Sequence, residues 1–180
     1  MIDFLRPDHY VRTVTGITPE WLRSRRIEAL ILDLDNTLTG WRDRDVPRAV
    51  REWMNAVQAS GVRLLVLTNC RSIRRVREVE KRLGIPAIGW ASKPRRRGFI
   101  RALEALACPP DRVAVVGDQT YTDILGARRA GLCSILVDRL TPNEFVLNRI
   151  GRCAQMWAIR RMGLVPREEL TAEPLDGQNK

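Results

Sequence analysis

Short apolar runs alternate along the chain with longer segments in which apolar residues recur every three or four positions. Such runs are typical of parallel strands buried on both faces, and the longer spacing is typical of helices with one buried face. We expect strands at residues 29–33, 62–67, 87–90, 112–116 and 134–137. We expect helices between them at residues 47–59, 72–83, 98–107 and 121–130. The alternation predicts a doubly wound α/β domain, a three-layer sandwich with right-handed crossovers.

Two further helical segments flank this alternating region. Thr18-Pro19-Glu20 has the residues of a helix start, with Thr as N-cap, Pro in the first turn and an acid at the positive end. This helix belongs to an N-terminal extension, residues 1–28, which we expect to pack on the domain; contact with a membrane interface is the alternative. A last amphipathic helix is expected over about 143–162, either on the core or at an interface. We therefore predict one domain over residues 1–164 and a polar flexible tail at 165–180.

Polar residues that suit metal and phosphate chemistry stand where the apolar runs end. In chain order they are Asp33 and Asp35, Thr68 and Asn69, Lys93, and Asp118 and Asp123. The C-terminal ends of parallel strands meet at one edge of the sheet, where α/β proteins place their binding sites. Two carboxylates at the end of a buried strand are costly unless their charge is compensated, and a divalent metal ion is the usual compensation. The sequence therefore predicts a metal site near Asp33 at this edge.

The composition indicates an anionic partner and excludes several classes of protein. The formal net charge is +10, and nearly all basic residues are arginine, which favours phospholipid headgroups, nucleic acid or a multiply phosphorylated substrate. Arginine-rich codon usage without a function is the alternative. The four cysteines are widely spaced, which argues against a zinc site or a disulfide framework. The sequence lacks an apolar stretch long enough for a transmembrane helix and the pattern of a signal peptide, so we expect a cytoplasmic protein.

Four strand-end segments resemble motifs I to IV of the haloacid dehalogenase (HAD) superfamily of phosphatases in identity, order and placement. The segments are Asp33-Leu34-Asp35-Asn36-Thr37, Thr68-Asn69, Lys93-Pro94 and Gly117-Asp118-Gln119-Thr120-Tyr121-Thr122-Asp123. The resemblance implies a five-stranded parallel sheet in the order 5-4-1-2-3, with the strands numbered along the chain. Strands 1 and 4 are then neighbours, which brings Asp33 close to Asp118.

The superfamily pattern also implies a role for each of these residues. Asp33 is the nucleophile that forms an aspartyl-phosphate, and Asp35 protonates the leaving group and then deprotonates the attacking water. Thr68 and Lys93 hold the phosphoryl oxygens. A Mg²⁺ ion is implied, and its predicted ligands are Asp33, Asp118, Asp123 and Asp35 through its backbone carbonyl. The predicted substrate-binding residues are Thr37, Asn69, Arg71, Arg95 and Arg96, with helix capping as the alternative role of Asn69.

The intervals between the motifs leave no room for a cap domain, which matches the cap-less subfamily IIIA. Within that subfamily the chain resembles the YqeG family over about residues 4–162. The further segments that carry this resemblance are Leu5-Arg6-Pro7-Asp8-His9-Tyr10-Val11, Ile17-Thr18-Pro19-Glu20-Trp21-Leu22, Leu83-Gly84-Ile85-Pro86 and Ala91-Ser92-Lys93-Pro94. One departure is Cys70, where the family pattern has Asn. The family is related to mitochondrial phosphatidylglycerophosphate phosphatases.

The resemblance implies a Mg²⁺-dependent phosphomonoesterase that converts phosphatidylglycerophosphate to phosphatidylglycerol. Its partners would be a phospholipid headgroup and an anionic membrane surface, with the protein peripheral on the inner face of the membrane. Two alternatives are a cap-less phosphatase that acts on nucleic-acid ends or a soluble phosphate, and a non-catalytic basic RNA-binding or assembly protein on the same scaffold. The oligomeric state is left open.

Overall fold

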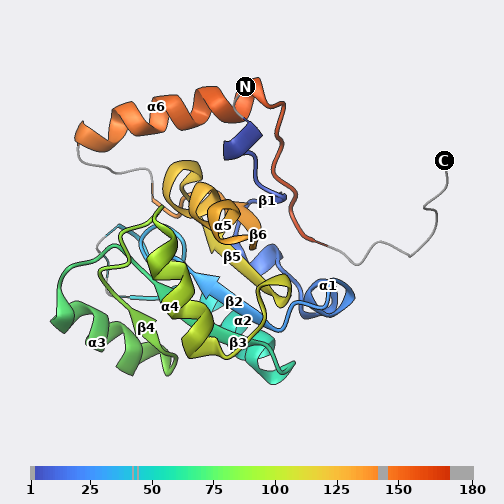
Figure 1. Cartoon of the computed structure of the whole chain (residues 1–180), viewed down its shortest axis with the longest axis vertical. Helices are drawn as coiled ribbons and strands as arrows, with labels where there is room; N and C mark the ends of the chain where they lie inside the picture. Colours follow the sequence, from blue (N-terminus) through green and yellow to red (C-terminus); the bar gives the residue numbers. More distant parts are fainter. Residues whose placement is uncertain (1–2, 42, 44, 142–145, 171–180) are drawn as a thin grey trace.

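The protein folds around one sheet of six parallel strands. The computed structural model describes residues 3–41, 43, 45–141 and 146–170 (Figure 1). The strands are β1 (His9–Val11), β2 (Ala29–Leu32), β3 (Arg63–Leu67), β4 (Ala87–Ile88), β5 (Val113–Gly117) and β6 (Cys133–Val137). They lie in the order β1-β6-β5-β2-β3-β4. The doubly wound α/β architecture predicted from the alternation is confirmed.

The predicted sheet of five strands in the order 5-4-1-2-3 is wrong in its strand count and in its full order. The five predicted strands are β6-β5-β2-β3-β4, and β1 adds a sixth strand on the outer side of β6. The pattern of apolar residues missed β1 because it has only three residues, of which Val11 alone is buried. Its place is set by long-range pairing: Val11 lies opposite Val137, and the Asp8 carboxylate accepts hydrogen bonds from the Ser134 N–H and hydroxyl.

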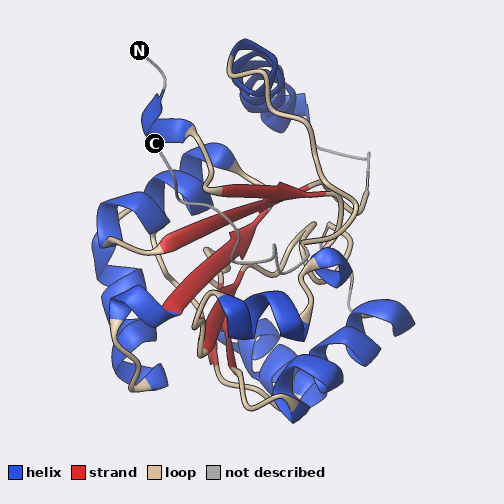
Figure 2. Ribbon diagram, turned by 90° about the vertical axis from the view of Figure 1, so that its right-hand side faces the viewer, coloured by secondary structure: helices blue, strands red, loops and turns tan. Residues whose placement is uncertain are grey.

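Helices cover both faces of the sheet, as Figure 2 shows. The α-helices of the described chain are α1 (Pro19–Ser24), α2 (Arg48–Ala59), α3 (Ile73–Leu83), α4 (Arg96–Leu106), α5 (Leu125–Ala130) and α6 (Val146–Arg161), of which α6 lies mostly apart from the sheet. Alternate strand residues divide the core into two layers. One layer packs against Trp21 of α1 and Trp53 of α2, and the other packs against Phe99 of α4 and Ala127 of α5. The strand runs are apolar throughout because they are buried on both faces.

The helix expected at 121–130 begins differently from the prediction. Residues Thr120–Ile124 form a π-helical turn, and the regular helix α5 starts only at Leu125. The wider turn carries Asp123, and only Asp118 and Gln119 separate it from the end of β5. Such turns are frequent at functional sites, and hydrophobic spacing does not distinguish them from an ordinary first helical turn.

The N-terminal extension and residues 165–170 both contact the domain, and they contact each other. The Thr18 side chain caps α1 by accepting a hydrogen bond from the Trp21 N–H, and Trp21 is buried, so α1 packs on the domain. Leu170 is also buried, and its N–H donates to the Gly16 carbonyl. The expectation of a flexible tail is therefore wrong for residues 165–170, while 171–180 lie outside the described residues. The sequence could not show this because Leu170 is an isolated apolar residue in a polar segment.

The last helix, α6, makes limited contact with the rest of the domain. Ala158 and Ile159 are buried, whereas Met156 and Trp157 are exposed. Gln155 ties this helix to the end of β5, because its amide donates to the Asp118 carbonyl and accepts from the Thr120 N–H. Within the described residues, each helix is too short or too polar to cross a membrane.

Candidate active site

The C-terminal ends of β2, β3 and β5 bring the predicted motif residues together. The register aligns Leu32 of β2 with Val66 of β3 and Val116 of β5. The residues that follow these strands, Asp33 and Thr68 among them, therefore meet at one edge of the sheet. The Asp33 N–H continues the ladder by donating to the Val116 carbonyl at 2.9 Å. This is the edge at which the sequence predicts a metal site.

Three buried carboxylates form the centre of the site. Asp33, Asp118 and Asp123 each place an oxygen within 4.8 Å of the others. The backbone of Gly117 makes room for this arrangement, because a Cβ at Gly117 would lie only 2.4–2.6 Å from the Asp123 side chain. The N–H of Gln119 donates to the second oxygen of Asp123 at 3.2 Å, which fixes that carboxylate in the π-helical turn.

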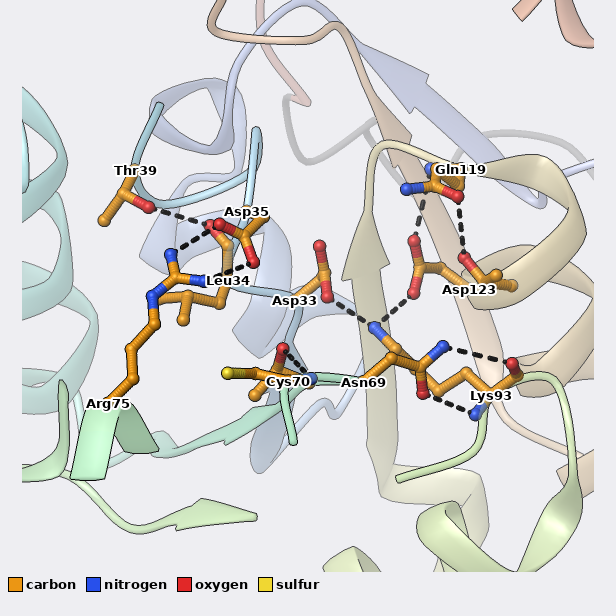
Figure 3. Close-up of polar contacts among 12 residues, drawn as sticks. Asp33, Leu34, Asp35, Thr39, Asn69, Cys70, Arg75, Lys93, Gln119 and Asp123 are labelled. Atoms are coloured by element: carbon orange, nitrogen blue, oxygen red, sulfur yellow. Dashed lines mark hydrogen bonds and ion pairs between the residues drawn. The ribbon is translucent and has the colours of Figure 1, made fainter. Parts of the chain in front are cut away.

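Lys93 lies between two of these carboxylates, as Figure 3 shows. Its ammonium donates to Asp33 at 2.5 Å and to Asp123 at 2.6 Å. Asn69 holds the Lys93 backbone from both sides, accepting from the Lys93 N–H at 2.7 Å and donating to the Lys93 carbonyl at 3.2 Å. The helix-capping alternative for Asn69 is wrong, because the side chain of Ser72 caps α3. Asn69 instead positions the only buried lysine in the described residues.

Burial and mutual repulsion control the protonation of this cluster. Burial raises the pKa of Asp33 to about 7, although the Lys93 ammonium opposes the shift. Burial also raises the pKa of Asp118 well above its usual value, and the charges of Asp33 and Asp123 add to the effect. For Lys93, burial acts to lower the pKa, but the Asp123 and Asp33 carboxylates reverse this and raise it above its usual value. An additional positive charge would therefore stabilise the ionised form of this carboxylate cluster.

The geometry fits a divalent cation with oxygen ligands. Asp118 is fully buried, and the Arg139 guanidinium lies 2.9 Å from one of its oxygens. Neither Asp118 oxygen accepts a well-aligned hydrogen bond from any described residue. A buried carboxylate without such bonds, next to Asp33 and Asp123, suits a hard cation such as Mg²⁺. These three side chains would hold the ion, and the predicted contribution of the Asp35 backbone carbonyl stays a prediction.

Asp35 points away from the carboxylate cluster and is paired with Arg75 of α3. Two guanidinium nitrogens of Arg75 donate to its two oxygens at 2.6 and 3.1 Å. The Thr68 hydroxyl accepts from the Cys70 N–H at 3.1 Å, so it is also held in place by its own loop. Cys70 thus contributes its backbone here, and the departure from the family pattern at its side chain leaves this contact intact.

The site opens into a cavity of about 750 Å³. Six of the predicted site residues line it: Asp33, Asp35, Thr68, Asn69, Arg71 and Lys93. Arg95 lines a second cavity of about 330 Å³ that shares Asn69, Arg71 and Lys93 with the first. Thr37 is buried, with its hydroxyl unpartnered among the described residues, and it lines neither cavity. Arg96 also lies outside both cavities, exposed at the first position of α4.

Two residues that contact the site were not assigned to it from the sequence. Arg75 pairs with Asp35, and Arg139, in the segment after β6, pairs with Asp118. The signal for Arg75 is its place, with Arg71 and Arg74, in the group of arginines that follows Thr68 at the sheet edge. Arg139 gives no such signal, because its contact depends on the pairing of β6 with β5.

Comparison with known proteins agrees with this geometry. A family model described as HAD-hydrolase-like matches residues 90–139. The chain is 35% identical to "Probable phosphatase YqeG" of Bacillus subtilis (strain 168), an alignment that covers 92% of this chain and 98% of that protein. It is 26% identical to chloroplastic phosphatidylglycerophosphate phosphatase 1 of Chlamydomonas reinhardtii, covering 77% of this chain and 55% of that protein.

A solved structure shows the same fold. It is that of an uncharacterized protein from Listeria monocytogenes serotype 4b, with a TM-score of 0.54 and 17% identity. The match covers 74% of this chain and 99% of that one. The catalytic assignment of this chain therefore rests on the strand-end residues and on the relatives in sequence.

Proposed function

Because this chain belongs to the YqeG family of HAD-type phosphatases, we propose that it hydrolyses phosphomonoesters with Mg²⁺ through an aspartyl-phosphate on Asp33. The observation that carries the proposal is the position of Asp33. Its carboxylate lies within 4.8 Å of the Asp118 and Asp123 oxygens, contacts Lys93 and lines an open cavity. The proposed nucleophile, the proposed metal site and the Lys93 ammonium that would bind the phosphoryl group are thus neighbours.

Each residue has a defined part in the two steps. A carboxylate oxygen of Asp33 attacks phosphorus and the bond to the leaving oxygen breaks, while Asp35 gives that oxygen a proton. Asp35 then takes a proton from the water that attacks the aspartyl-phosphate, which restores Asp33 and releases phosphate. Lys93 and Thr68 hold the phosphoryl oxygens in both steps. Bound Mg²⁺ would neutralise negative charge on the nucleophile and the phosphoryl group.

We propose phosphatidylglycerophosphate as the substrate. The identity to the algal phosphatidylglycerophosphate phosphatase supports this. The short spacing of the motifs also supports it: the described elements are α2 and β3 between Asp33 and Thr68, and α3 and β4 between Thr68 and Lys93. The cluster of arginines at the cavity would meet an anionic headgroup. A cytoplasmic protein that binds peripherally to an anionic membrane surface is part of the same proposal.

The test is Mg²⁺-dependent phosphate release from phosphatidylglycerophosphate in mixed micelles. We expect wild-type release that EDTA abolishes, and Asp33→Asn should reduce it at least about 10³-fold because the nucleophile is lost. Asp111→Asn, which removes an exposed carboxylate outside the site, should retain full activity. Equal turnover by Asp33→Asn and wild type would contradict the assignment of the nucleophile.

The arginines at the cavity also favour a second candidate class of substrate, phosphorylated nucleic-acid ends. The guanidinium groups that would meet a lipid headgroup also suit a polynucleotide backbone. The same assay with a 5′-phosphorylated oligonucleotide and with small phosphate esters tests this alternative. Preferential release from these compounds would keep the mechanism and change the substrate. The non-catalytic alternative is set aside, because the chain is a HAD-type phosphatase by family and the motif residues gather at one site.

A further inference from the structure

The second cavity shares three residues with the active-site cavity. It measures about 330 Å³ and is lined by Asn69, Arg71, Trp90, Ser92, Lys93 and Arg95. Lys93 also contacts Asp33, the proposed nucleophile. The second cavity therefore adjoins the point at which we place the reacting phosphate.

The two cavities differ in how their cations are paired. Arg71 lines both cavities, but the other two arginines of the first are paired: Arg75 binds Asp35, and Arg74 lies 3.2 Å from Glu78. In the second, neither Arg71 nor Arg95 forms an ion pair with a carboxylate of the described chain, and no acidic residue appears in the lining. The Lys93 ammonium is already paired with Asp33 and Asp123. The two unpaired guanidinium groups therefore make the second cavity favourable for an anion.

The Trp90 ring lies against one of these guanidinium groups. The guanidinium carbon of Arg71 lies 5.3 Å from the centre of the Trp90 ring. A guanidinium over an aromatic face keeps its N–H groups free to donate in its own plane. Arg95 approaches from another element, as the N-cap residue of α4, whose N-terminal end is itself positive. Arg71 and Arg95 therefore come from two different loops to line one cavity.

We propose that this second cavity binds a second phosphate group of the substrate, separate from the one that is hydrolysed. Arg71 and Arg95 are the side chains that recognise it. The proposal rests on the proposed phosphatase function and adds a substrate requirement to it: the enzyme prefers esters that carry a second phosphate. The phosphodiester of a lipid headgroup and the second phosphate of a soluble compound share this chemistry. Trp90, 56% exposed, offers an apolar surface beside it.

The test compares three substrates. Glycerol 3-phosphate carries one phosphate, glycerophosphoglycerophosphate is soluble and carries a phosphomonoester and a phosphodiester, and dihexanoyl phosphatidylglycerophosphate adds short acyl chains. We expect the double variant Arg71→Gln/Arg95→Gln to lower kcat/KM for both two-phosphate substrates relative to glycerol 3-phosphate. The ratio should fall at least about tenfold, mainly through KM, because charged hydrogen bonds to the second phosphate are lost.

A matched control separates local recognition from net charge. The variant Arg77→Gln/Arg101→Gln removes the same charge from two exposed positions outside both cavities. We expect it to leave the ratio within about twofold of wild type, since exposed charges outside the cavities are screened by solvent and salt. An equal fall in both double variants, or no fall in either, would overturn the proposal. A fall confined to the lipid would overturn it too, because the arginines would then act on acyl chains or aggregates.

A binding measurement keeps this result separate from the phosphatase assignment. Titration calorimetry of Asp33→Asn with glycerophosphoglycerophosphate, with and without the Arg71→Gln/Arg95→Gln changes, needs no turnover. At least about tenfold weaker binding in the triple variant supports the second-phosphate site, even if no ester is hydrolysed and the proposed function fails. Unchanged binding overturns the site while leaving hydrolysis by the wild type intact. A higher kcat/KM for the lipid or for the soluble headgroup identifies the source of the second phosphate.

Discussion

Arg75 binds both carboxylate oxygens of Asp35, across 40 residues of sequence. Both side chains are largely buried, and the two parallel hydrogen bonds fix the plane of the carboxylate. In the proposed mechanism Asp35 must reach the leaving oxygen with the correct orientation. Arg75 is therefore a positioning residue for the proton donor, supplied by α3 and not by the strand that carries Asp35.

Replacing Arg75 with Gln should lower kcat by a factor that depends on the leaving group of the substrate. We expect a loss of about 100-fold for an alkyl phosphate, because misplacing a catalytic group typically costs this much. The loss should be about tenfold or less for 4-nitrophenyl phosphate, whose leaving group departs without a proton. Steady-state kinetics of both substrates give the comparison, and Arg77→Gln on the same helix is the control. Equal losses for both substrates would show that Arg75 does not act through Asp35.

Lys93 should matter for stability as well as for turnover. Lys93→Met leaves Asp33 and Asp123 buried without their shared ammonium, and breaking a buried pair in this way costs about 3–5 kcal/mol. Chemical unfolding in EDTA should show this loss, and added Mg²⁺ should recover part of the stability but not the activity. Lys81→Met, at an exposed position of α3, should change neither quantity. Full activity of Lys93→Met would refute its role at the phosphoryl group.

The metal-free protein should lose stability as the pH rises. The folded-state pKa of Asp33 is raised to about 7 from 3.8, and that of Asp118 is raised in the same direction. Between pH 4 and 7 the folded protein thus holds a proton that the unfolded chain has released. Its free energy of unfolding should fall by about 1.4 kcal/mol per pH unit for each such proton. Thermal unfolding in EDTA across this range measures the slope.

Two additions to that experiment identify the groups responsible. Asp33→Asn removes one of the titrating carboxyl groups and should flatten the slope. Mg²⁺ binds the ionised carboxylates and should stabilise the protein more at pH 7 than at pH 5. Stability that rises with pH in EDTA, or a slope that Asp33→Asn leaves unchanged, would contradict the assignment.

Gly117→Ala should weaken Mg²⁺ binding. A Cβ at this position would lie 2.4–2.6 Å from the Asp123 side chain and displace it from Asp33 and Asp118. We expect about tenfold weaker Mg²⁺ binding by calorimetry, the typical effect of disturbing the support of a metal site. Gly126→Ala is the contrasting variant, since its Cβ would meet the Phe99 ring. It should destabilise the protein and leave Mg²⁺ affinity nearly unchanged.

The motif residues could be predicted from the sequence because each follows directly after a buried apolar run. Asp33, Thr68 and Asp118 owe their proximity to the order of β2, β3 and β5, which the resemblance to HAD phosphatases implied correctly, and to the register of these strands. Lys93 follows the short strand β4 and reaches the centre through its own long side chain and the two hydrogen bonds between its backbone and the Asn69 side chain. Local pattern and strand order together were enough for this part of the site.

The remaining contacts could not be predicted because they join segments with no local signal. Arg139 meets Asp118 only because β6 lies beside β5, and a single arginine after a strand looks like any exposed cation. The pairing of β1 depends on Asp8 and on Ser134, not on an apolar run. Thr37 matched the motif, yet its side chain is buried away from both cavities, since the motif does not determine the orientation of each side chain.

The attachment of β1 to β6 has a consequence for the order of folding. The contact between Asp8 and Ser134 closes a loop of 126 residues, whereas the pairing of β2 with β3 joins neighbours in the chain. Long loops cost more chain entropy to close, so the central strands gain their contacts first. The strands that carry Asp33, Thr68 and Asp118 can thus assemble before the outer strand docks. Hydrogen exchange should accordingly be faster in β1 than in β2 or β5.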